Sequence, residues 1–308
     1  MALTINTNLS SMIVQSNINK ATVSLNKAIE RMTTGYKINH AADNAAGYSI
    51  ARNWEAKLGS LDVAADNAAT GADMLSTLED HYALISTHIQ RVRDLTEQAA
   101  NGTYGTQSLE AIKSEIQARL EEVDRIAANC EFSGVNLMKG MDKDTYLQVG
   151  LDSNADKSMI KLEKSLFADG SVKALFTRED DATTPDVDET YAPAEGTDAC
   201  RSAIATDCAN LGGDGHPTAA KMLEKIDYVI DTISKRVTTL GAAQNRVESA
   251  IESIAVQSEN IMSSLSTLRD ADVAEESSNY IKAQILQQAS ATLLATANQQ
   301  PSIALNLL

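Results

Sequence analysis

Histidines are the first residues of this chain that could do chemistry, and there are four of them. His81 and His88 are seven residues apart in a segment with helical periodicity, so they could share one face of a helix. A zinc site on a single helix prefers histidines four residues apart, together with further ligands. We therefore interpret all four as surface or helix-seam residues: His40, His81, His88 and His216.

The cysteines are the next candidates, and their number and spacing predict free thiols. Three is an odd number, and no two of them have the CxxC spacing that is typical of metal and redox sites. A bridge between Cys200 and Cys208 inside a loop is the alternative. The third cysteine is Cys130.

The acidic residues form no catalytic pair. Neighbouring acids on a predicted helix, such as Glu275 and Glu276, do not face each other. Residues 170–217 hold ten acids against three bases, but their spacing does not match an EF-hand calcium loop, so we interpret them as solvated. The sequence also lacks HExxH, GxSxG, a phosphate-binding glycine loop and GxGxxG. It therefore predicts neither an enzyme nor a cofactor or metal site.

Composition and charge narrow the class of protein further. Among 308 residues there are only three Phe and one Trp, which suits narrow helix–helix seams better than a thick core. The net charge of −16 argues against nucleic acid as a partner. No apolar run approaches the ~20 residues of a membrane span. The first ten residues resemble no secretory signal peptide, which on general rules indicates the cytoplasm.

The longest element that could position side chains is the segment 226–268. Read in alternating steps of four and three residues, it keeps apolar side chains at all but two of thirteen positions. This heptad seam is typical of a coiled-coil helix. At 1.5 Å per residue it predicts a rod of roughly 65 Å, which needs a partner helix. The seam contains Ile226, Ile230, Ile233, Val237, Leu240, Gln244, Val247, Ile251, Ile254, Ser258, Ile261, Leu265 and Leu268.

Other segments show the same helical spacing. A first helix is predicted after Asn6, Thr7 or Asn8, with Gly35 as its stop. A second rod of about 50 residues runs from Ile50 to near Asn101, with Asp43 as a candidate N-cap. A third helix covers about 108–129, and a last one follows the break at 270–272 and is expected to stop at Pro301. The first and last helices carry the apolar residues Val14, Ile18, Ala21, Leu25, Ala28, Met32, Ile281, Ile285, Ala289, Leu293 and Ala297.

Between the third helix and the long rod, the pattern changes twice. Residues 145–150 and 158–163 alternate with period two around a turn at 152–154, which predicts a β-hairpin. Residues 170–216 read as a surface insertion with some order around Ser202–Leu211. Because the elements mirror about residue 190, the simplest closure pairs the first helix with the last, and the second with the 226–268 rod. The predicted fold is mainly α, with long antiparallel coiled-coil helices from both chain ends, a small β-hairpin and a short insertion.

Five segments resemble bacterial flagellins, in the right order and at the right ends of the chain. The resemblance covers about 1–165 and 217–308, and leaves the acidic insertion as the variable region. Departures from the signature are His40, where a Ser is usual, and Asn44, where an acid is usual. The matching segments are ERMTTGYKINHAADNAAG (30–47), QRVRDLTEQAANGT (90–103), FSGVNL (132–137), LQVG (147–150) and LATANQQPSIALNLL (294–308).

The resemblance implies a structural subunit that polymerises into the extracellular flagellar filament. It implies export without a cleaved signal, which reverses the cytoplasmic inference. It implies a flagellar export apparatus, a flagellin chaperone, and filament cap and hook-junction proteins as partners. A hook–filament junction protein is the alternative, but it should lack a good match to 90–103. The implied parts are an inner core (1–45 with 270–308), an outer core (46–169 with 217–269) and the insertion (170–216).

The resemblance also implies which residues carry these functions. Both chain ends would assemble through Val14, Ile18, Leu25, Met32, Ile281, Ile285, Leu293 and the apolar C-terminal Leu307. A second surface would contact neighbouring subunits and the flagellin-sensing Toll-like receptor of a host. That surface contains Gln90, Arg91, Leu95, Glu115 and Arg119.

Overall fold

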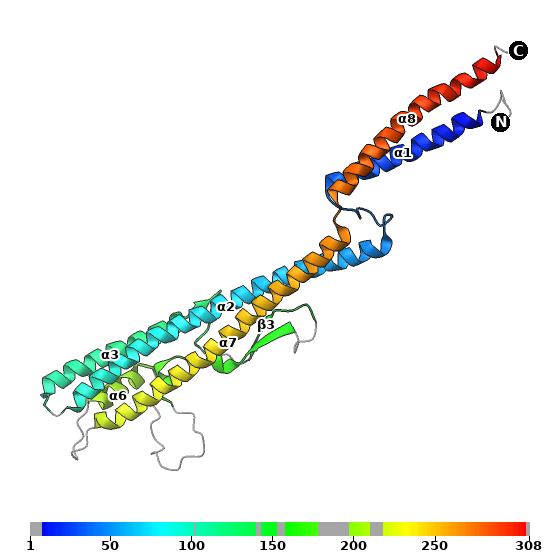
Figure 1. Cartoon of the computed structure of the whole chain (residues 1–308). Helices are drawn as coiled ribbons and strands as arrows, with labels where there is room; N and C mark the ends of the chain where they lie inside the picture. Colours follow the sequence, from blue (N-terminus) through cyan, green and yellow to red (C-terminus); the bar gives the residue numbers. More distant parts are fainter. Residues whose placement is uncertain are drawn as a thin grey trace. The chain divides into compact units, whose positions relative to one another are not determined.

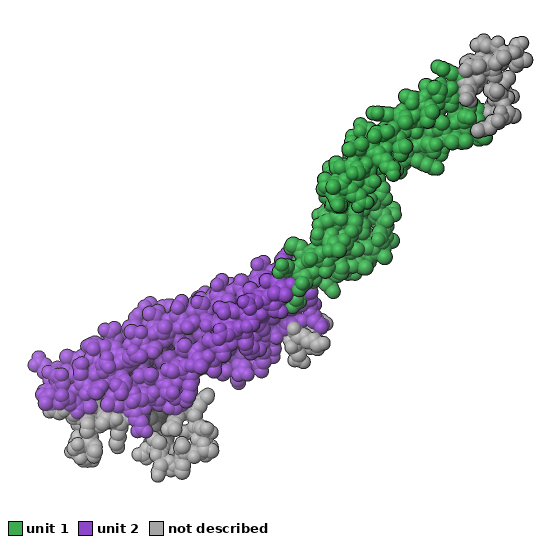
Figure 2. Space-filling view, viewed as in Figure 1, with its two compact units in different colours: residues 1–60, 257–308 green, residues 61–256 purple. Residues whose placement is uncertain are grey.

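The computed structural model describes residues 8–101, 103–139, 143–152, 158–177, 197–209 and 218–305. Its contacts divide the chain into two compact units, coloured separately in Figure 2. Unit 1 contains residues 1–60 and 257–308, and unit 2 contains residues 61–256. Both divisions fall inside continuous long helices. The division into an inner core, an outer core and an insertion stays a prediction.

The described residues are mostly helical, which confirms the predicted fold class (Figure 1). None of the helices in the described ranges is long and apolar enough to cross a membrane. The elements are α1 (Leu9–Thr34), α2 (Ala45–Ala100), α3 (Thr106–Asn129), β1 (Glu131–Phe132), β2 (Val135–Asn136), β3 (Thr145–Gln148), β4 (Met159–Leu162), η1 (Lys164–Phe167), α5 (Val172–Phe176), α6 (Thr197–Ala209), α7 (Thr218–Arg269) and α8 (Val273–Leu305).

Unit 1 pairs the first helix with the last, as predicted: α1 and α8 lie side by side (Figure 1). Asn8 begins α1, because its side-chain oxygen accepts a hydrogen bond from the Ser11 amide at 3.1 Å. Gly35 ends it in the left-handed conformation, with φ of 75°. The prediction of Asp43 as the N-cap of α2 was wrong. Asn44 takes that place by accepting from the Gly47 amide at 2.9 Å.

Unit 2 pairs α2 with α7 along the predicted seams. Leu75, Leu78, Tyr82 and Ile85 of α2 are fully buried, as are alternate seam positions of α7 such as Leu240. Polar contacts join the same two helices as well: Gln244, in the middle of α7, donates to Glu79 at 2.8 Å, and Arg93, near the end of α2, pairs with Asp227 at 2.6 Å. The long seam therefore finds its partner helix inside the chain.

The predicted β-hairpin is confirmed and packs against α2. Strands β3 and β4 are antiparallel, with Thr145 opposite Leu162 and Gln148 opposite Met159. A Cβ atom at Gly71 of α2 would lie 2.4 Å from a methyl group of Leu147. The glycine thus lets the hairpin lie directly on the helix. Most of the predicted turn, 153–154, lies outside the described residues.

The described parts of 170–216 are two helices in contact with α3, not a solvated loop. Residues Val172 and Leu175 of α5, and Ile204 and Cys208 of α6, are buried. Asp124 of α3 holds both helices, since it accepts from the Val172 amide at 2.8 Å and pairs with Arg201 at 2.6 Å. Residues 178–196 and 210–217, which hold most of the acids, lie outside the described residues.

Candidate assembly surface

The α1–α8 pair is joined by small residues and side-chain hydrogen bonds. Ala28 and Ala283 are buried, and their small size lets the two backbones approach. Asn8 donates to the carbonyl of Ala297 at 2.7 Å, and Ser11 donates to the side chain of Asn298 at 2.8 Å. Few large apolar side chains are therefore buried between the two helices.

Large apolar side chains instead remain on the outward faces of both helices. Of the predicted assembly residues, Ile281, Ile285 and Leu293 are 54%, 59% and 56% exposed. Met32 is also exposed, while Val14, Ile18 and Leu25 are half-buried. Leu307 lies outside the described residues. The sequence pattern missed Leu9, Met12, Ile13, Val23, Ile29 and Leu286, which are exposed apolar residues off the predicted seam.

Two bends in unit 1, one after α1 and one before α8, are hydrogen-bonded to each other. The Lys37 amide donates to the carbonyl of Arg269 at 2.7 Å, and the Ala271 amide donates to the carbonyl of Gly35 at 2.8 Å. The Lys37 ammonium donates to the carbonyl of Thr267 at 2.8 Å. We call residues 35–37 and 267–271 together the clasp. It fixes where both paired helices begin to run along each other.

Arg269 anchors the clasp through its side chain. Its guanidinium lies over the ring of Tyr36, 4.0 Å from the ring centroid, and forms an ion pair with Glu55 of α2. Sequence reasoning missed this residue, because nothing in the helical period of α7 marks its last position. An arginine followed by acids at a predicted helix end was the available signal.

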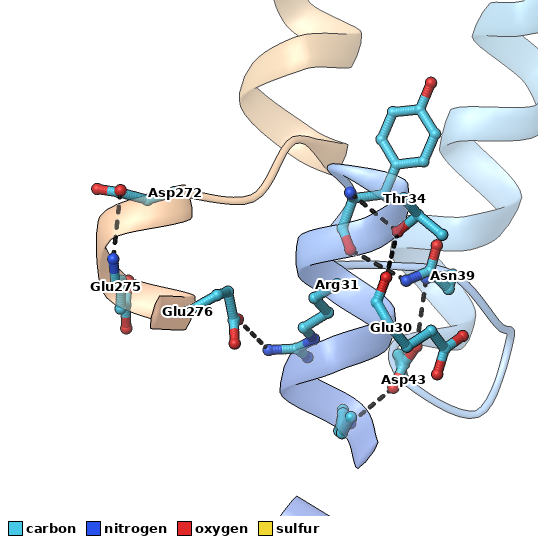
Figure 3. A network of polar contacts seen from close by, with 10 residues as sticks. Glu30, Arg31, Thr34, Asn39, Asp43, Asp272, Glu275 and Glu276 are labelled. Carbon is cyan, nitrogen blue, oxygen red and sulfur yellow. Dashed lines mark hydrogen bonds and ion pairs between the residues drawn. The ribbon is translucent and has the colours of Figure 1, made fainter. Parts of the chain in front are cut away.

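A second polar network holds the ends of α1 and α8 together (Figure 3). Arg31 pairs with Glu276 at 2.8 Å, and this glutamate is buried. Asp43 pairs with Lys27 at 2.6 Å and accepts from the amides of Asn39 and His40. The Lys27 ammonium and these two amides lower the pKa of Asp43 from 3.8 to about 2. The connector after α1 is thus folded around a charged carboxylate.

The predicted receptor and inter-subunit residues lie together in unit 2. Arg91 donates from two nitrogens to Glu115, at 3.1 and 3.0 Å, and Arg119 lies 3.8 Å from the same carboxylate. The Arg91 side chain is 43% exposed, and Gln90 is also exposed. Leu95 is only 1% exposed, so in the isolated chain it lies beneath this surface.

The side chains of two of the three cysteines are described by the structure, and both lie in unit 2. Cys130 and Cys208 are free and buried, as the spacing predicted, and burial raises their thiol pKa values to about 11 and about 12. The side chain of Cys200 lies outside the described residues. Among the residues described, no three His, Cys, Asp or Glu side chains could hold a metal ion.

Comparisons with known proteins agree with the order of these elements. Residues 5–143 match the model of the bacterial flagellin N-terminal helical region, and residues 223–308 match that of the C-terminal helical region. The chain is 35% identical to a flagellin of Xenorhabdus nematophila over 315 residues, with all of both chains covered. The chain belongs to the bacterial flagellin family. It is also 32% identical to a flagellin of Bacillus subtilis, covering 99% of each chain.

Membership of the flagellins settles the broad function. The protein is a structural subunit of the bacterial flagellar filament and not an enzyme. A putative flagellar hook-associated protein from Vibrio parahaemolyticus has a similar fold, with a TM-score of 0.58 at 12% identity. That likeness covers 74% of this flagellin and all of the other chain, and it concerns the fold alone.

Proposed function

We propose that this flagellin polymerises through the outward faces of α1 and α8 into an extracellular filament that serves motility. The observation that supports this is the set of large apolar side chains in solvent on both helices, such as Met12, Ile13, Ile281 and Ile285. Soluble monomers rarely leave apolar surface of this kind uncovered. Burial of one such side chain stabilises by about 1.5–3 kcal/mol. Other subunits are the natural cover, since each presents the same faces.

Seeded growth followed by electron microscopy tests the proposal. Purified protein is incubated with short filament seeds beside a chain without residues 1–40 and 270–308. A finer comparison uses Ile281→Gln with Ile285→Gln on α8 against Leu84→Gln, an equally exposed leucine of unit 2. We expect long filaments from the intact chain and from Leu84→Gln only. Equal growth of the α8 variant would contradict the assignment of this face.

The alternative is a hook–filament junction protein, which would share the terminal helices. The same experiment separates the two functions. A junction protein would form short, stable oligomers that do not extend, whereas a filament subunit adds to seeds without limit. A clean monomer under all conditions would contradict both.

We also propose that the chain passes unfolded through the flagellar export apparatus, without a cleaved signal and with the help of a flagellin chaperone. Filament cap and hook-junction proteins would contact it at the filament ends. The construction of the α1–α8 pair supports this, because small residues and exposed hydrogen bonds resist separation only weakly. The mass of the protein isolated from filaments shows whether an N-terminal signal has been cleaved off. A mature chain that lacks an N-terminal segment would contradict export without cleavage.

We further propose that the surface around Arg91 is read by the flagellin-sensing Toll-like receptor and is buried between subunits in the filament. The part-exposed pair of Arg91 with Glu115, in which two guanidinium nitrogens donate to one carboxylate oxygen, supports this, since a guanidinium presents planar, directional hydrogen-bonding groups to a partner. Gln90 and Arg119 widen the surface, and Leu95 supports it from below. Receptor signalling by soluble protein and by intact filaments distinguishes the two roles.

A further inference from the structure

The net charge of this flagellin lies entirely in unit 2. Unit 1 has eight basic and eight acidic residues, so its formal charge is zero while the whole chain carries −16. Because unit 1 is neutral, the unit 1 parts of two subunits can approach without net electrostatic repulsion. The negative charge of unit 2 keeps the protein soluble. The apolar faces described above belong to the neutral unit.

Within unit 1 the charges are separated along the chain. Residues 1–29 and 277–308 contain three lysines and no acid. The remainder, residues 30–60 and 257–276, contains eight acids and five bases. Unit 1 therefore has a positive end, made by α1 up to Ile29 and α8 from Ser277, and a negative end, made by the clasp and the helix turns beside it.

A cleft with a volume of about 530 Å³ lies between α1 and α8, mostly within the positive end, and it reaches the negative end at Arg31 and Glu276. Lys20, Lys27, Arg31 and Lys282 line it, with Glu276 as its one acidic residue. Lys27 and Arg31 are neutralised by Asp43 and Glu276. Among the described residues, Lys20 and Lys282 have no carboxylate partner. The cleft thus carries two uncompensated cations.

The negative end presents exposed carboxylates at the junction of α7 and α8. Asp270 and Asp272 are exposed, and each accepts only local hydrogen bonds. The side chain of Glu275, at the start of α8 in Figure 3, has no basic partner within the described parts of the chain. These carboxylates are negative, so they could pair with the two lysines of the cleft that have no carboxylate partner.

We propose that the cleft of one subunit binds the carboxylates of the α7–α8 junction of a second subunit. Asp270, Asp272 and Glu275 of one copy face Lys20 and Lys282 of the next. This contact joins two different surfaces, so it is head-to-tail and repeats without closing, as an open filament requires. Charge complementarity fixes the register, while the apolar faces supply most of the affinity. The inference rests on the proposed polymerisation and names the polar contact within it.

Charge reversal and charge exchange test this contact in full-length protein. The critical concentration for seeded growth is measured for Lys20→Glu, for Lys282→Glu, and for Lys282→Glu combined with Glu275→Lys. Lys57→Glu is the matched control, because Lys57 is an exposed lysine of unit 1 outside the cleft. All four substitutions are at exposed positions, where folding tolerates change, and circular dichroism of the filaments confirms helicity.

We expect each cleft variant to raise the critical concentration about fivefold at low salt, and the exchanged double variant to restore most of it. The difference from wild type should shrink at about 0.5 M salt, where exposed charges are screened. If both cleft variants match Lys57→Glu, or if the exchange restores nothing, the contact is refuted while polymerisation stands. If wild-type protein itself fails to extend seeds, the proposed function falls, and this inference falls with it.

Discussion

The guanidinium of Arg269 lies over the ring of Tyr36, 4.0 Å from its centroid. The side chain of the last residue of α7 thereby contacts the second residue after the end of α1. The carbonyl of Arg269 accepts from Lys37 in the same place, and its guanidinium pairs with Glu55. The clasp therefore depends on one residue more than on any other, and this leads to the first prediction.

Replacement of Arg269 should loosen the clasp. The Arg269→Ala variant loses a stacked cation worth about 0.5–1 kcal/mol and a charge-assisted hydrogen bond worth about 1.5–3 kcal/mol. We expect faster hydrogen exchange at the Lys37 and Ala271 amides in filaments. Arg52→Ala is the control, because Arg52 also stacks on a tyrosine and pairs with Glu55, but does so on the exposed face of a single helix. Equal exchange in both variants would show that Arg269 has no special role.

Acid should weaken the connector after α1 through Asp43. Its pKa is lowered from 3.8 to about 2 in the folded chain, so the stabilisation is complete above 3.8 and is lost as pH falls toward 2. The Asp43→Asn variant lacks this dependence. We expect wild-type filaments to be the more stable at pH 6, and the difference to vanish near pH 2. Asp62→Asn, an exposed change on α2, should show no such window. A difference that persists unchanged into acid would exclude Asp43 as its source.

The Arg91→Asp variant should lose receptor signalling and assemble poorly. It places two carboxylates where a hydrogen-bonded ion pair now lies. The exchanged variant, Arg91→Glu with Glu115→Arg, keeps the ion pair and should recover assembly. It should not recover receptor signalling, because the positive and negative groups have changed places. Arg125→Asp, on an exposed intrahelical pair of α3, is the control. Unchanged signalling by Arg91→Asp would remove this site.

Asp124 should decide whether α6 stays on α3. The Asp124→Ala variant removes this carboxylate from Arg201, whose side chain is 14% exposed, and removes the acceptor of the Val172 amide. Loss of one partner costs about 3–5 kcal/mol in a fully buried pair, and this pair is partly exposed, so we expect a clear but smaller fall in the denaturation midpoint and faster exchange throughout α6. Lys235→Ala breaks an exposed pair on α7 and should change stability by less than about 1 kcal/mol. Protection of α6 in the Asp124 variant would contradict this role.

Two glycines of unit 2 should respond in opposite ways to alanine. No atom lies within 4 Å of a Cβ placed at Gly241, so Gly241→Ala should stabilise α7 by about 1 kcal/mol. At Gly71 the same methyl group would meet Leu147 at 2.4 Å, and the hairpin must shift. Thermal melting compares them, with the midpoint raised by about 2–4 °C for Gly241→Ala only. A similar rise for Gly71→Ala would show that the hairpin is not held against α2.

Helical periodicity predicted the elements because long seams repeat one physical requirement many times. The seam from Ile226 to Ile254 and the stop at Gly35 were predicted in this way. Periodicity could not predict contacts that occur once, such as Arg269 with Tyr36, or the choice of Asn44 over Asp43 as a cap. Acidic composition also misrepresented 170–216, because the buried face of α6 consists of a few residues such as Ile204 and Cys208.

The hydrogen bond from Asn8 to Ala297 joins residues 289 positions apart in the chain. This separation determines when the contact can form during folding. Loop closure over such a length adds to the entropic barrier, and contacts between distant residues form late. If the chain is exported unfolded, as we propose, the end that emerges first must wait for the other before α1 and α8 can pair. The surface that the two helices build together would then form only after the whole polypeptide has emerged.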